Sequence, residues 1–214
     1  MVSIYGLLPT DMARQSISEF LGTALMVGLG CGSVYYGASH EWISFTFAAA
    51  VTLAILLFGN ISGAHINPAV SIAFWREGRI DNRQLRLYIC GQLTGALFAA
   101  MLLGGAGPTT IAPNLTLLQA FTIEVVITMI LMLSIFLVVQ REPSIPVLAL
   151  WVGATVGILA YFAGPETGAS MNPARTFGPN IVSGLWPSLL FYSTSTILGA
   201  WLACDVKRLA FREK

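Results

Sequence analysis

Residues Gly63-Ala64-His65-Ile66-Asn67-Pro68-Ala69 return 105 positions later as Gly168-Ala169-Ser170-Met171-Asn172-Pro173-Ala174. Both segments end in the tripeptide Asn-Pro-Ala. Proline suits the first turn of a helix, where its missing N–H would have no intrahelical partner. Asparagine is a favourable N-cap directly before that position. The two segments therefore predict two helix starts at equivalent places in two related halves of the chain.

The relation between the halves extends beyond these segments. The same separation of 105 residues relates Glu19 to Glu124, Thr23 to Thr128 and Gly59 to Gly164. We therefore expect a single domain over residues 1–214 that consists of two repeats, approximately 1–110 and 111–214.

The composition indicates an integral membrane protein. The chain is 56% hydrophobic and 10% charged, whereas a soluble domain carries about 25% charged residues. Its mean hydropathy is +0.76. We expect a lipid bilayer as its surroundings. The net charge of +1 gives no reason to expect a nucleic-acid partner.

Six apolar stretches approach the length of about 20 residues that a membrane-spanning helix needs. The predicted spans are 15–36, 42–60, 83–104, 116–139, 145–163 and 186–206. Two shorter segments, 67–76 and 172–183, begin at the Asn-Pro-Ala motifs and are too short to cross a bilayer. They are predicted to be re-entrant half-helices that lie inside protein or beside water. The expected fold class is an all-α membrane protein.

Lysine and arginine residues predict the orientation. Ten of the eleven fall on one side of the six-span arrangement: Arg14, Arg76, Arg79, Arg83, Arg86, Arg141, Lys207, Arg208, Arg212 and Lys214. The positive-inside rule makes that side cytoplasmic, so we expect a multi-pass protein of the plasma or inner membrane with both termini in the cytoplasm. Asp11 and Arg14 lead directly into the first span, and no cleavable signal peptide is expected.

Three spans per half place the second half in the membrane with inverted topology. The N-termini of the half-helices, with Asn67 and Asn172, should then meet near the midplane. Each N-terminus carries roughly half a positive charge, and the asparagine amides offer N–H donors to the lumen. This arrangement predicts a pore for small neutral molecules that repels cations, including hydrated protons.

Two stretches, Ile61–Val70 and Gly168–Pro179, resemble the two signatures of the aquaporin (major intrinsic protein) family. Glu19-Phe20-Leu21-Gly22-Thr23 is similar to the first span of that family. The resemblance covers essentially the whole chain. It implies the aquaporin fold, a right-handed bundle of six spans and two half-helices with one pore per subunit, and a homotetramer.

The resemblance also implies a four-residue selectivity filter beside the motifs, formed by Phe47, Ala160, Ala169 and Arg175. Water-selective members usually carry a histidine where this chain has Ala160. Two small residues in one filter predict a wider opening, similar to the filters of plant nodulin-like intrinsic proteins and their bacterial relatives. Those filters are associated with arsenous, boric or silicic acid. We expect a passive channel for metalloid hydroxides such as arsenous acid, together with glycerol and water.

A water-selective aquaporin is the alternative. Glycerol-conducting members usually have an aspartate directly after the filter arginine, and this chain has Thr176. They also tend to carry bulky aromatic residues where Ala169 stands. The signals for the permeant solute are therefore mixed.

Glu19 and Glu124 are carboxylates inside apolar spans, which makes them candidates for a function. One role is a proton relay in a coupled secondary transporter. The other is structural, with each carboxylate accepting N–H groups of a re-entrant loop, and their symmetric placement favours it. His65 is expected to orient its loop or to line the pore, and a lone histidine is no metal site.

No enzyme, metal or cofactor is expected, because the chain shows no nucleophile–base pair and no cluster of metal ligands. Cys31, Cys90 and Cys204 all lie in apolar stretches, so we expect them to be small buried residues of the helix packing. His40 and Glu41 are expected in a solvated loop.

Overall fold

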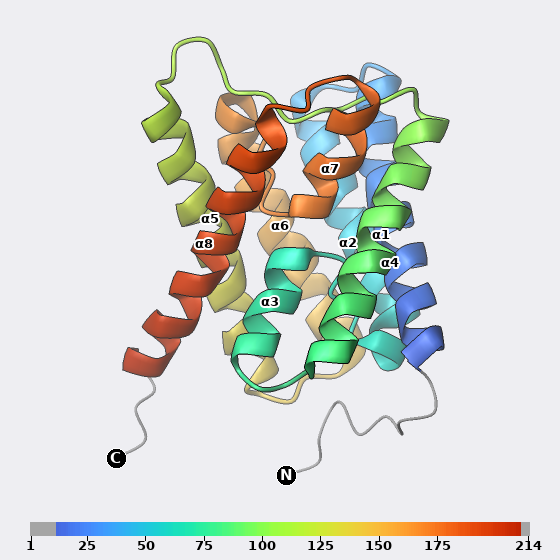
Figure 1. Cartoon of the computed structure of the whole chain (residues 1–214), viewed down its shortest axis with the longest axis vertical. Helices are drawn as coiled ribbons and strands as arrows, with labels where there is room; N and C mark the ends of the chain where they lie inside the picture. Colours follow the sequence, from blue (N-terminus) through green and yellow to red (C-terminus); the bar gives the residue numbers. More distant parts are fainter. Residues whose placement is uncertain (1–11, 211–214) are drawn as a thin grey trace.

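The computed structural model describes residues 12–210 as eight α-helices (Figure 1). They are α1 (Met12–Tyr35), α2 (His40–Ser62), α3 (Pro68–Arg76), α4 (Asn82–Leu102), α5 (Leu117–Val139), α6 (Ile145–Thr167), α7 (Pro173–Val182) and α8 (Ser188–Ala210). All but α3 and α7 are long and apolar enough to cross a membrane, and the described residues form no β-strand. The predicted fold class is confirmed. The expectation about a signal peptide, and the residues Arg212 and Lys214, lie outside the described part.

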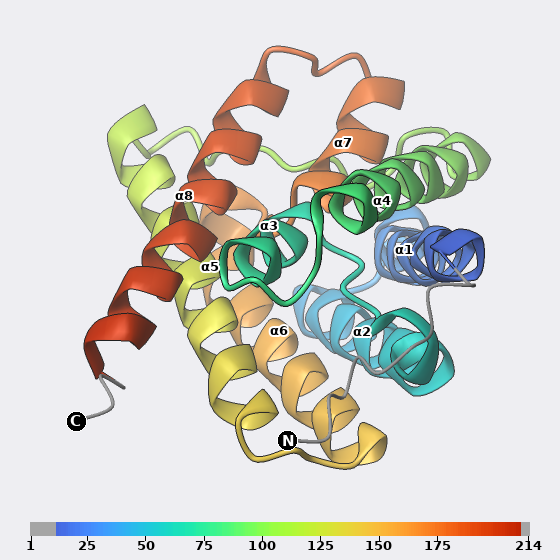
Figure 2. The same cartoon turned by 60° about the horizontal axis from the view of Figure 1, so that its bottom comes forward.

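The helices of the two repeats make equivalent contacts. In the first repeat, α1 packs against α2 and α4, and in the second, α5 packs against α6 and α8. The two groups lie on opposite sides of the molecule (Figure 2). They are joined by contacts between α2 and α6, and by the half-helices, since α3 also contacts α8 and α7 also contacts α4.

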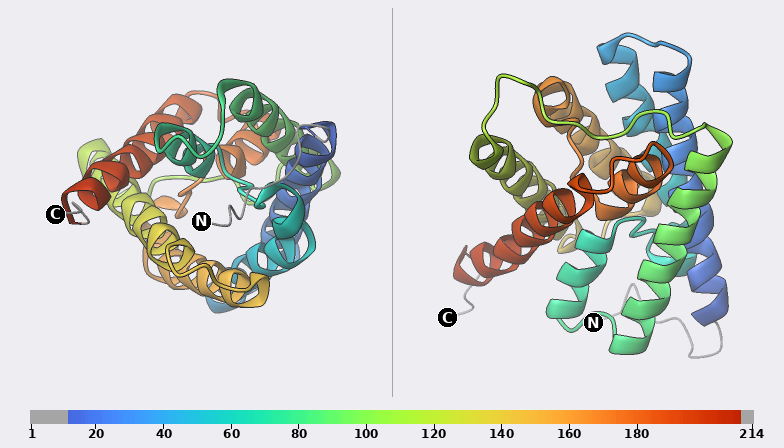
Figure 3. Two further views of the ribbon diagram at one scale, coloured as in Figure 1. Left: turned by 90° about the horizontal axis from the view of Figure 1, so that it is seen from below. Right: turned by 45° about the horizontal axis from the view of Figure 1, so that its top comes forward.

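The half-helices enter from opposite ends. In Figure 1, α3 occupies the lower half of the bundle and α7 the upper half, and the two are in contact. We call the lower end, where α1 begins and α8 ends, the terminal end. Seen from that end, the long helices surround the bundle axis and α3 lies between α4 and α8 (Figure 3, left). Pro68 and Pro173 are the first residues of α3 and α7, which confirms the predicted helix starts.

Glycine residues allow α1 and α4 to approach closely. A Cβ atom on Gly91 would lie 2.5 Å from the carbonyl oxygen of Ser16, and one on Gly95 would lie 2.3 Å from that of Phe20. Small residues at such crossings are the usual means of packing helices in lipid, where burial of apolar surface gives little driving force.

The end of α6 differs from the prediction. The predicted span ends at residue 163, but the helix continues through Pro165 to Thr167. Proline has no N–H, so the carbonyl of Tyr161 has no helical partner there. His40 donates from Nε2 to this carbonyl at 2.7 Å, and its ring stacks on that of Tyr161. The expected loop position of His40 and Glu41 is therefore wrong, because α2 begins at His40. Glu41 is exposed and His40 partly exposed, as expected of solvated residues.

The cysteines differ from one another. Cys31 and Cys204 are buried, as expected, but Cys90 is exposed. The prediction for Cys90 is wrong because its apolar stretch, α4, has an outward face as well as a packed one, and hydropathy alone does not distinguish them.

The terminal end carries the basic residues of the described chain, apart from Arg175. Some of them form ion pairs that attach α3 to α8. Arg76 donates to the carboxylate of Asp205 at 2.5 Å. Glu77, directly after α3, pairs with Lys207 and, at 3.2 Å, with Arg208.

Candidate functional site

The loops that lead into α3 and α7 have the same unusual backbone. Gly63 and Gly168 end α2 and α6 with φ values of 83° and 76°, in the left-handed region that favours glycine. Four further residues that are not glycine also have positive φ: Ala64 (46°), Ile66 (45°), Ala169 (42°) and Met171 (51°). Each such residue costs about 1–3 kcal/mol. The loops therefore need support from outside.

Glu19 of α1 provides this support for the first loop. Its carboxylate accepts the backbone N–H groups of His65 at 2.9 Å and Ile66 at 2.6 Å. It also accepts the Ser62 hydroxyl at 2.6 Å and Gln92 Nε2 at 2.8 Å. Hydrogen bonds to a charged acceptor contribute roughly 1.5–3 kcal/mol each, which is enough to offset the strain of the loop.

Glu124 of α5 does the same for the second loop. It accepts the backbone N–H groups of Ser170 at 2.8 Å and Met171 at 3.0 Å, and the Thr167 hydroxyl at 2.7 Å. These three donors lie 105 residues after their counterparts in the first loop. Glu19 and Glu124 are both fully buried and neither lines the cavity described below.

The asparagines of the motifs cap the half-helices. Asn67 Oδ1 accepts the backbone N–H of Ala69 at 2.9 Å. Asn172 Oδ1 accepts those of Ala174 at 2.9 Å and Arg175 at 3.3 Å. Both asparagines have extended backbone and precede a proline, so the predicted N-caps are confirmed.

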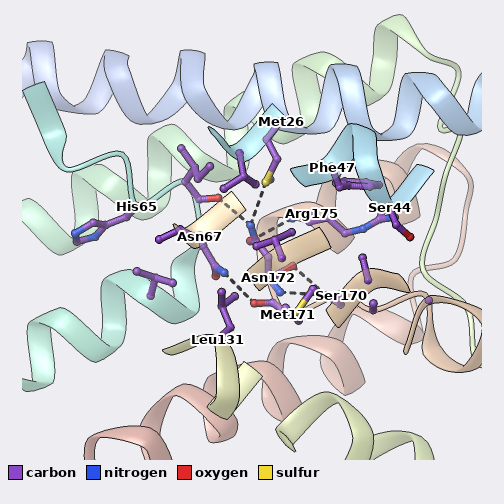
Figure 4. A pocket seen from close by; sticks show the side chains of 18 of the residues that line it. Met26, Ser44, Phe47, His65, Asn67, Leu131, Ser170, Met171, Asn172 and Arg175 are labelled. Carbon is purple, nitrogen blue, oxygen red and sulfur yellow. Dashed lines mark hydrogen bonds between the residues drawn. The ribbon is translucent and has the colours of Figure 1, made fainter. Parts of the chain in front are cut away.

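The other end of each asparagine side chain binds the opposite loop. Asn67 Nδ2 donates to the carbonyl of Met171, and Asn172 Nδ2 donates to the carbonyl of Ile66, both at 2.8 Å (Figure 4). A primary amide has two N–H donors. One donor of each asparagine is therefore used between the loops, which the sequence did not predict, and Asn172 Nδ2 also contacts Met26 Sδ at 3.7 Å.

A cavity of about 270 Å³ passes between the two half-helix N-termini. Its lining runs from His40 at one end of α2 to Ile55, and includes Val139 at the end of α5. Asn67 and Asn172 lie on its wall (Figure 4). Among the described residues that line it, none is an aspartate or a glutamate, and Arg175 is the one lysine or arginine.

The four residues of the expected filter all line this cavity. Phe47 comes from α2, Ala160 from α6, Ala169 from the second loop and Arg175 from α7. Figure 4 shows Phe47 and Arg175 together, on the side of the asparagines away from His65. The walls here are an aromatic ring, two methyl groups and one guanidinium.

Arg175 is buried in the wall and is held by neutral groups. Its Nη1 donates to the carbonyl of Gly107 at 2.6 Å and contacts Cys31 Sγ at 3.6 Å. Its Cζ lies 4.8 Å from the centre of the Phe47 ring. No carboxylate of the described residues lies within 4.0 Å of it. The positive charge therefore has no direct ion-pair partner and acts on whatever enters the cavity.

His65 lines the cavity on the side toward the terminal end. Its Nδ1 lies 3.1 Å from the Ser71 hydroxyl, and its ring stacks on Phe74 at 4.8 Å between centres. Both roles proposed for it from the sequence, in the loop and in the lumen, fit this position. No group of three or more metal-ligating side chains occurs within residues 12–210.

Several lining residues were not found from the sequence. Met26 contacts Asn172 Nδ2 through its sulfur at 3.7 Å, Met171 precedes Asn172 directly, and Ser44 lies one turn before Phe47. Met26 follows Glu19 by two helical turns on the same face of α1, which is a usable signal. The carbonyl of Gly107 that holds Arg175 has no such signal, because it belongs to a loop without a motif.

The comparisons with known proteins agree with this geometry. The model of the family described as "Major intrinsic protein" matches residues 8–206. Aquaporin NIP1-1 of Zea mays is 38% identical over 201 residues, which cover 87% of this chain and 71% of that protein. Aquaporin-4 of Mus musculus is 36% identical, covering 95% and 69%. A glycerol uptake facilitator protein of Pseudomonas aeruginosa is 36% identical, covering 83% and 77%.

A solved structure shows the same fold. The X-ray structure of the aquaglyceroporin from Plasmodium falciparum matches with a TM-score of 0.83 at 25% identity, over 92% of this chain and 96% of that chain. Six apolar spans, two half-helices and a central cavity define a multi-pass membrane channel. The chain belongs to the major intrinsic protein family, whose members are channels rather than enzymes.

Proposed function

We propose that the protein is a passive channel for small neutral hydroxylated solutes, such as glycerol and arsenous acid, with water. The observation that carries this proposal is the lining around Arg175. Ala160 and Ala169 present only methyl groups, Phe47 presents a flat apolar wall, and Arg175 supplies fixed donors on one side. Such a wall accommodates a solute with a carbon or metalloid centre, while the guanidinium binds its hydroxyl groups.

The chemistry of the solute follows from this lining. Arsenous acid is uncharged at neutral pH and carries three hydroxyl groups, as does glycerol. Neither is repelled by Arg175 or by the half-helix N-termini, both of which oppose cations. The relatives named above include a glycerol uptake facilitator and an aquaglyceroporin, which favours the wider class of solute.

Passive transport is favoured over coupled transport by the carboxylates. Glu19 and Glu124 lie outside the cavity lining and hold the loops, so they offer no proton relay along the solute path. We expect solute flux in proteoliposomes to be unaffected by an imposed proton or sodium gradient. Flux that follows either gradient would instead indicate a secondary transporter.

The second candidate is a water-selective channel. It is favoured by the similarity to Aquaporin-4 over 95% of this chain. It is also favoured by Thr176, which stands where glycerol-conducting members usually have an aspartate. The Thr176 hydroxyl lies 2.9 Å from that of Thr109 and 2.7 Å from that of Ser170. The two candidates differ in whether solutes larger than water pass.

Stopped-flow light scattering of proteoliposomes separates them. Water, glycerol, urea and arsenous acid are compared in the wild type and in Ala160→His. An imidazole at this position narrows the cavity, so we expect glycerol and arsenous acid flux to fall by more than about tenfold, an increase of about 1.4 kcal/mol in the barrier, with water flux retained. Ala160→Ser, which adds little volume, is the control and should keep all fluxes.

Two outcomes would contradict the proposal. If wild-type flux of glycerol and arsenous acid is no greater than in empty vesicles, the protein is instead the second candidate, a water-selective channel. Unchanged large-solute flux in Ala160→His would show that Ala160 does not border the narrow part of the path.

We further propose the orientation and assembly. The basic residues at the terminal end of the described chain support cytoplasmic termini in the cell membrane, and similarity to the family supports a homotetramer. Protease protection of tagged termini in sealed vesicles and native mass spectrometry test the two points.

A further inference from the structure

The Phe47 ring lies with one face directly against α1. A Cβ atom built on Gly30 would lie 2.2 Å from Phe47 Cε1, 2.4 Å from Cδ1 and 2.6 Å from Cζ. Favourable contacts between carbon atoms are about 3.5–4.0 Å. The ring therefore occupies space that any side chain at position 30 would fill, and it lies as far back from the cavity as α1 allows.

The other side of the ring faces Arg175. The guanidinium carbon lies 4.8 Å from the ring centre, and Arg175 is fixed behind by the Gly107 carbonyl. Figure 4 shows the two side chains next to each other at the cavity. A ring pushed away from α1 must therefore move toward Arg175 and the lumen.

We propose that Gly30 is a positioning residue that sets the width of the constriction from outside the lumen. Because position 30 has no side chain, Phe47 lies back against α1 and leaves room for solutes larger than water. Gly30 does not line the cavity itself. The inference rests on the proposed function, in which Phe47 borders the path of the larger solutes.

Gly28 and Gly32 provide matched controls on the same helix. A Cβ atom on Gly28 would have its nearest neighbour, the Ala99 Cβ, at 3.9 Å, and one on Gly32 would have Leu103 Cδ2 at 4.0 Å. Both are ordinary contacts. Alanine also favours a helix more than glycine does, and this effect is common to all three positions, so a comparison among them isolates the contact with Phe47.

The test compares Gly30→Ala with Gly28→Ala and Gly32→Ala in proteoliposomes. The added methyl group must displace the ring by about 1 Å or more. We expect the ratio of glycerol to water permeability to fall by about tenfold in Gly30→Ala and to stay within about twofold of the wild type in the two controls. A Phe47→Ala background removes the ring, and there Gly30→Ala should leave the ratio unchanged.

Two results would overturn the inference. One is a ratio in Gly30→Ala equal to that of the controls, which would mean that α1 and α2 separate and the ring stays in place. The other is an equal effect of Gly30→Ala with and without Phe47. A wild type that passes only water would contradict the proposed function instead, and the inference is then tested by water permeability, which should fall in Gly30→Ala and not in Gly28→Ala.

Discussion

The loop before α3 and the loop before α7 have the same framework and differ in the side chains it presents. In both, a buried glutamate accepts two backbone N–H groups, and an asparagine caps one half-helix and binds the other loop. Three residues after the asparagine, however, the first half has Val70 and the second has Arg175. The common part holds the strained backbone of both loops. The different part places a charge on one side of the asparagines only.

A second difference lies in how each half-helix is held at its far end. Glu77, after α3, pairs with Lys207 and Arg208 of α8. In α7, Asn180 instead uses neutral hydrogen bonds, donating to the Thr109 carbonyl and accepting the Thr109 N–H, both at 2.9 Å. The first half-helix is thus held by charges and the second by amide groups.

The largest loss of stability is expected when the buried glutamate that supports either loop is removed. Glu19→Ala deprives four donors of their acceptor and Glu124→Ala deprives three. Since an unsatisfied buried donor costs about 1–3 kcal/mol, we expect each variant to lose at least about 3 kcal/mol, and Glu19→Ala to lose more. Thermal unfolding in detergent measures this, with exposed Glu41→Ala as the control. Equal stability of Glu19→Ala and the control would mean that the loops do not depend on this carboxylate.

The next largest effect is expected on cation exclusion, when Arg175 is replaced by the residue of the first half. Arg175→Val gives the second half the valine that the first half has at Val70. It removes a charge that has no ion-pair partner. We expect cation leakage through the channel to rise by about tenfold or more, because a unit charge at 4 Å contributes about 4 kcal/mol at an effective dielectric constant of 20. Conductance of planar bilayers provides the measurement, and Arg175→Lys should keep the barrier. An unchanged conductance would assign cation exclusion to the half-helix dipoles alone.

The smallest effect concerns the far ends of the half-helices. Glu77→Gln should cost about 1–2 kcal/mol, because the Glu77 side chain is only 8% exposed but glutamine keeps one oxygen acceptor. This loss in the free energy of unfolding should shrink at 1 M salt, where the Debye length is about 3 Å. The loss in free energy of unfolding caused by Asn180→Leu should not depend on salt. Unfolding midpoints at low and high salt compare the two. The exposed partner Arg208 should account for the part of the loss that salt screens, and no loss in Glu77→Gln at either salt concentration would contradict electrostatic attachment of α3.

Much of the fold follows from local signals. Hydropathy and length locate the six spans, and the Asn-Pro pairs locate the starts of α3 and α7 to the residue. The end of α6 could not be located in this way. Pro165 indicates a stop, but the carbonyl that it leaves free is bonded by His40, which is 121 residues away. The prediction that Cys90 is buried was wrong for a related reason, because the face of a helix that meets lipid depends on its neighbours.

The sequence by itself determined the helices, their caps and the repeat, because apolar runs, prolines and asparagine caps act within a few residues of themselves. The resemblance to the family also named the residues proposed to govern selectivity. Only the tertiary structure decided how these residues are held: the exchange of amide bonds between the loops, the Gly107 carbonyl behind Arg175 and the Phe47 ring against Gly30. Each of these contacts joins segments far apart in the chain, and their distances depend on how the helices pack rather than on any spacing in the sequence.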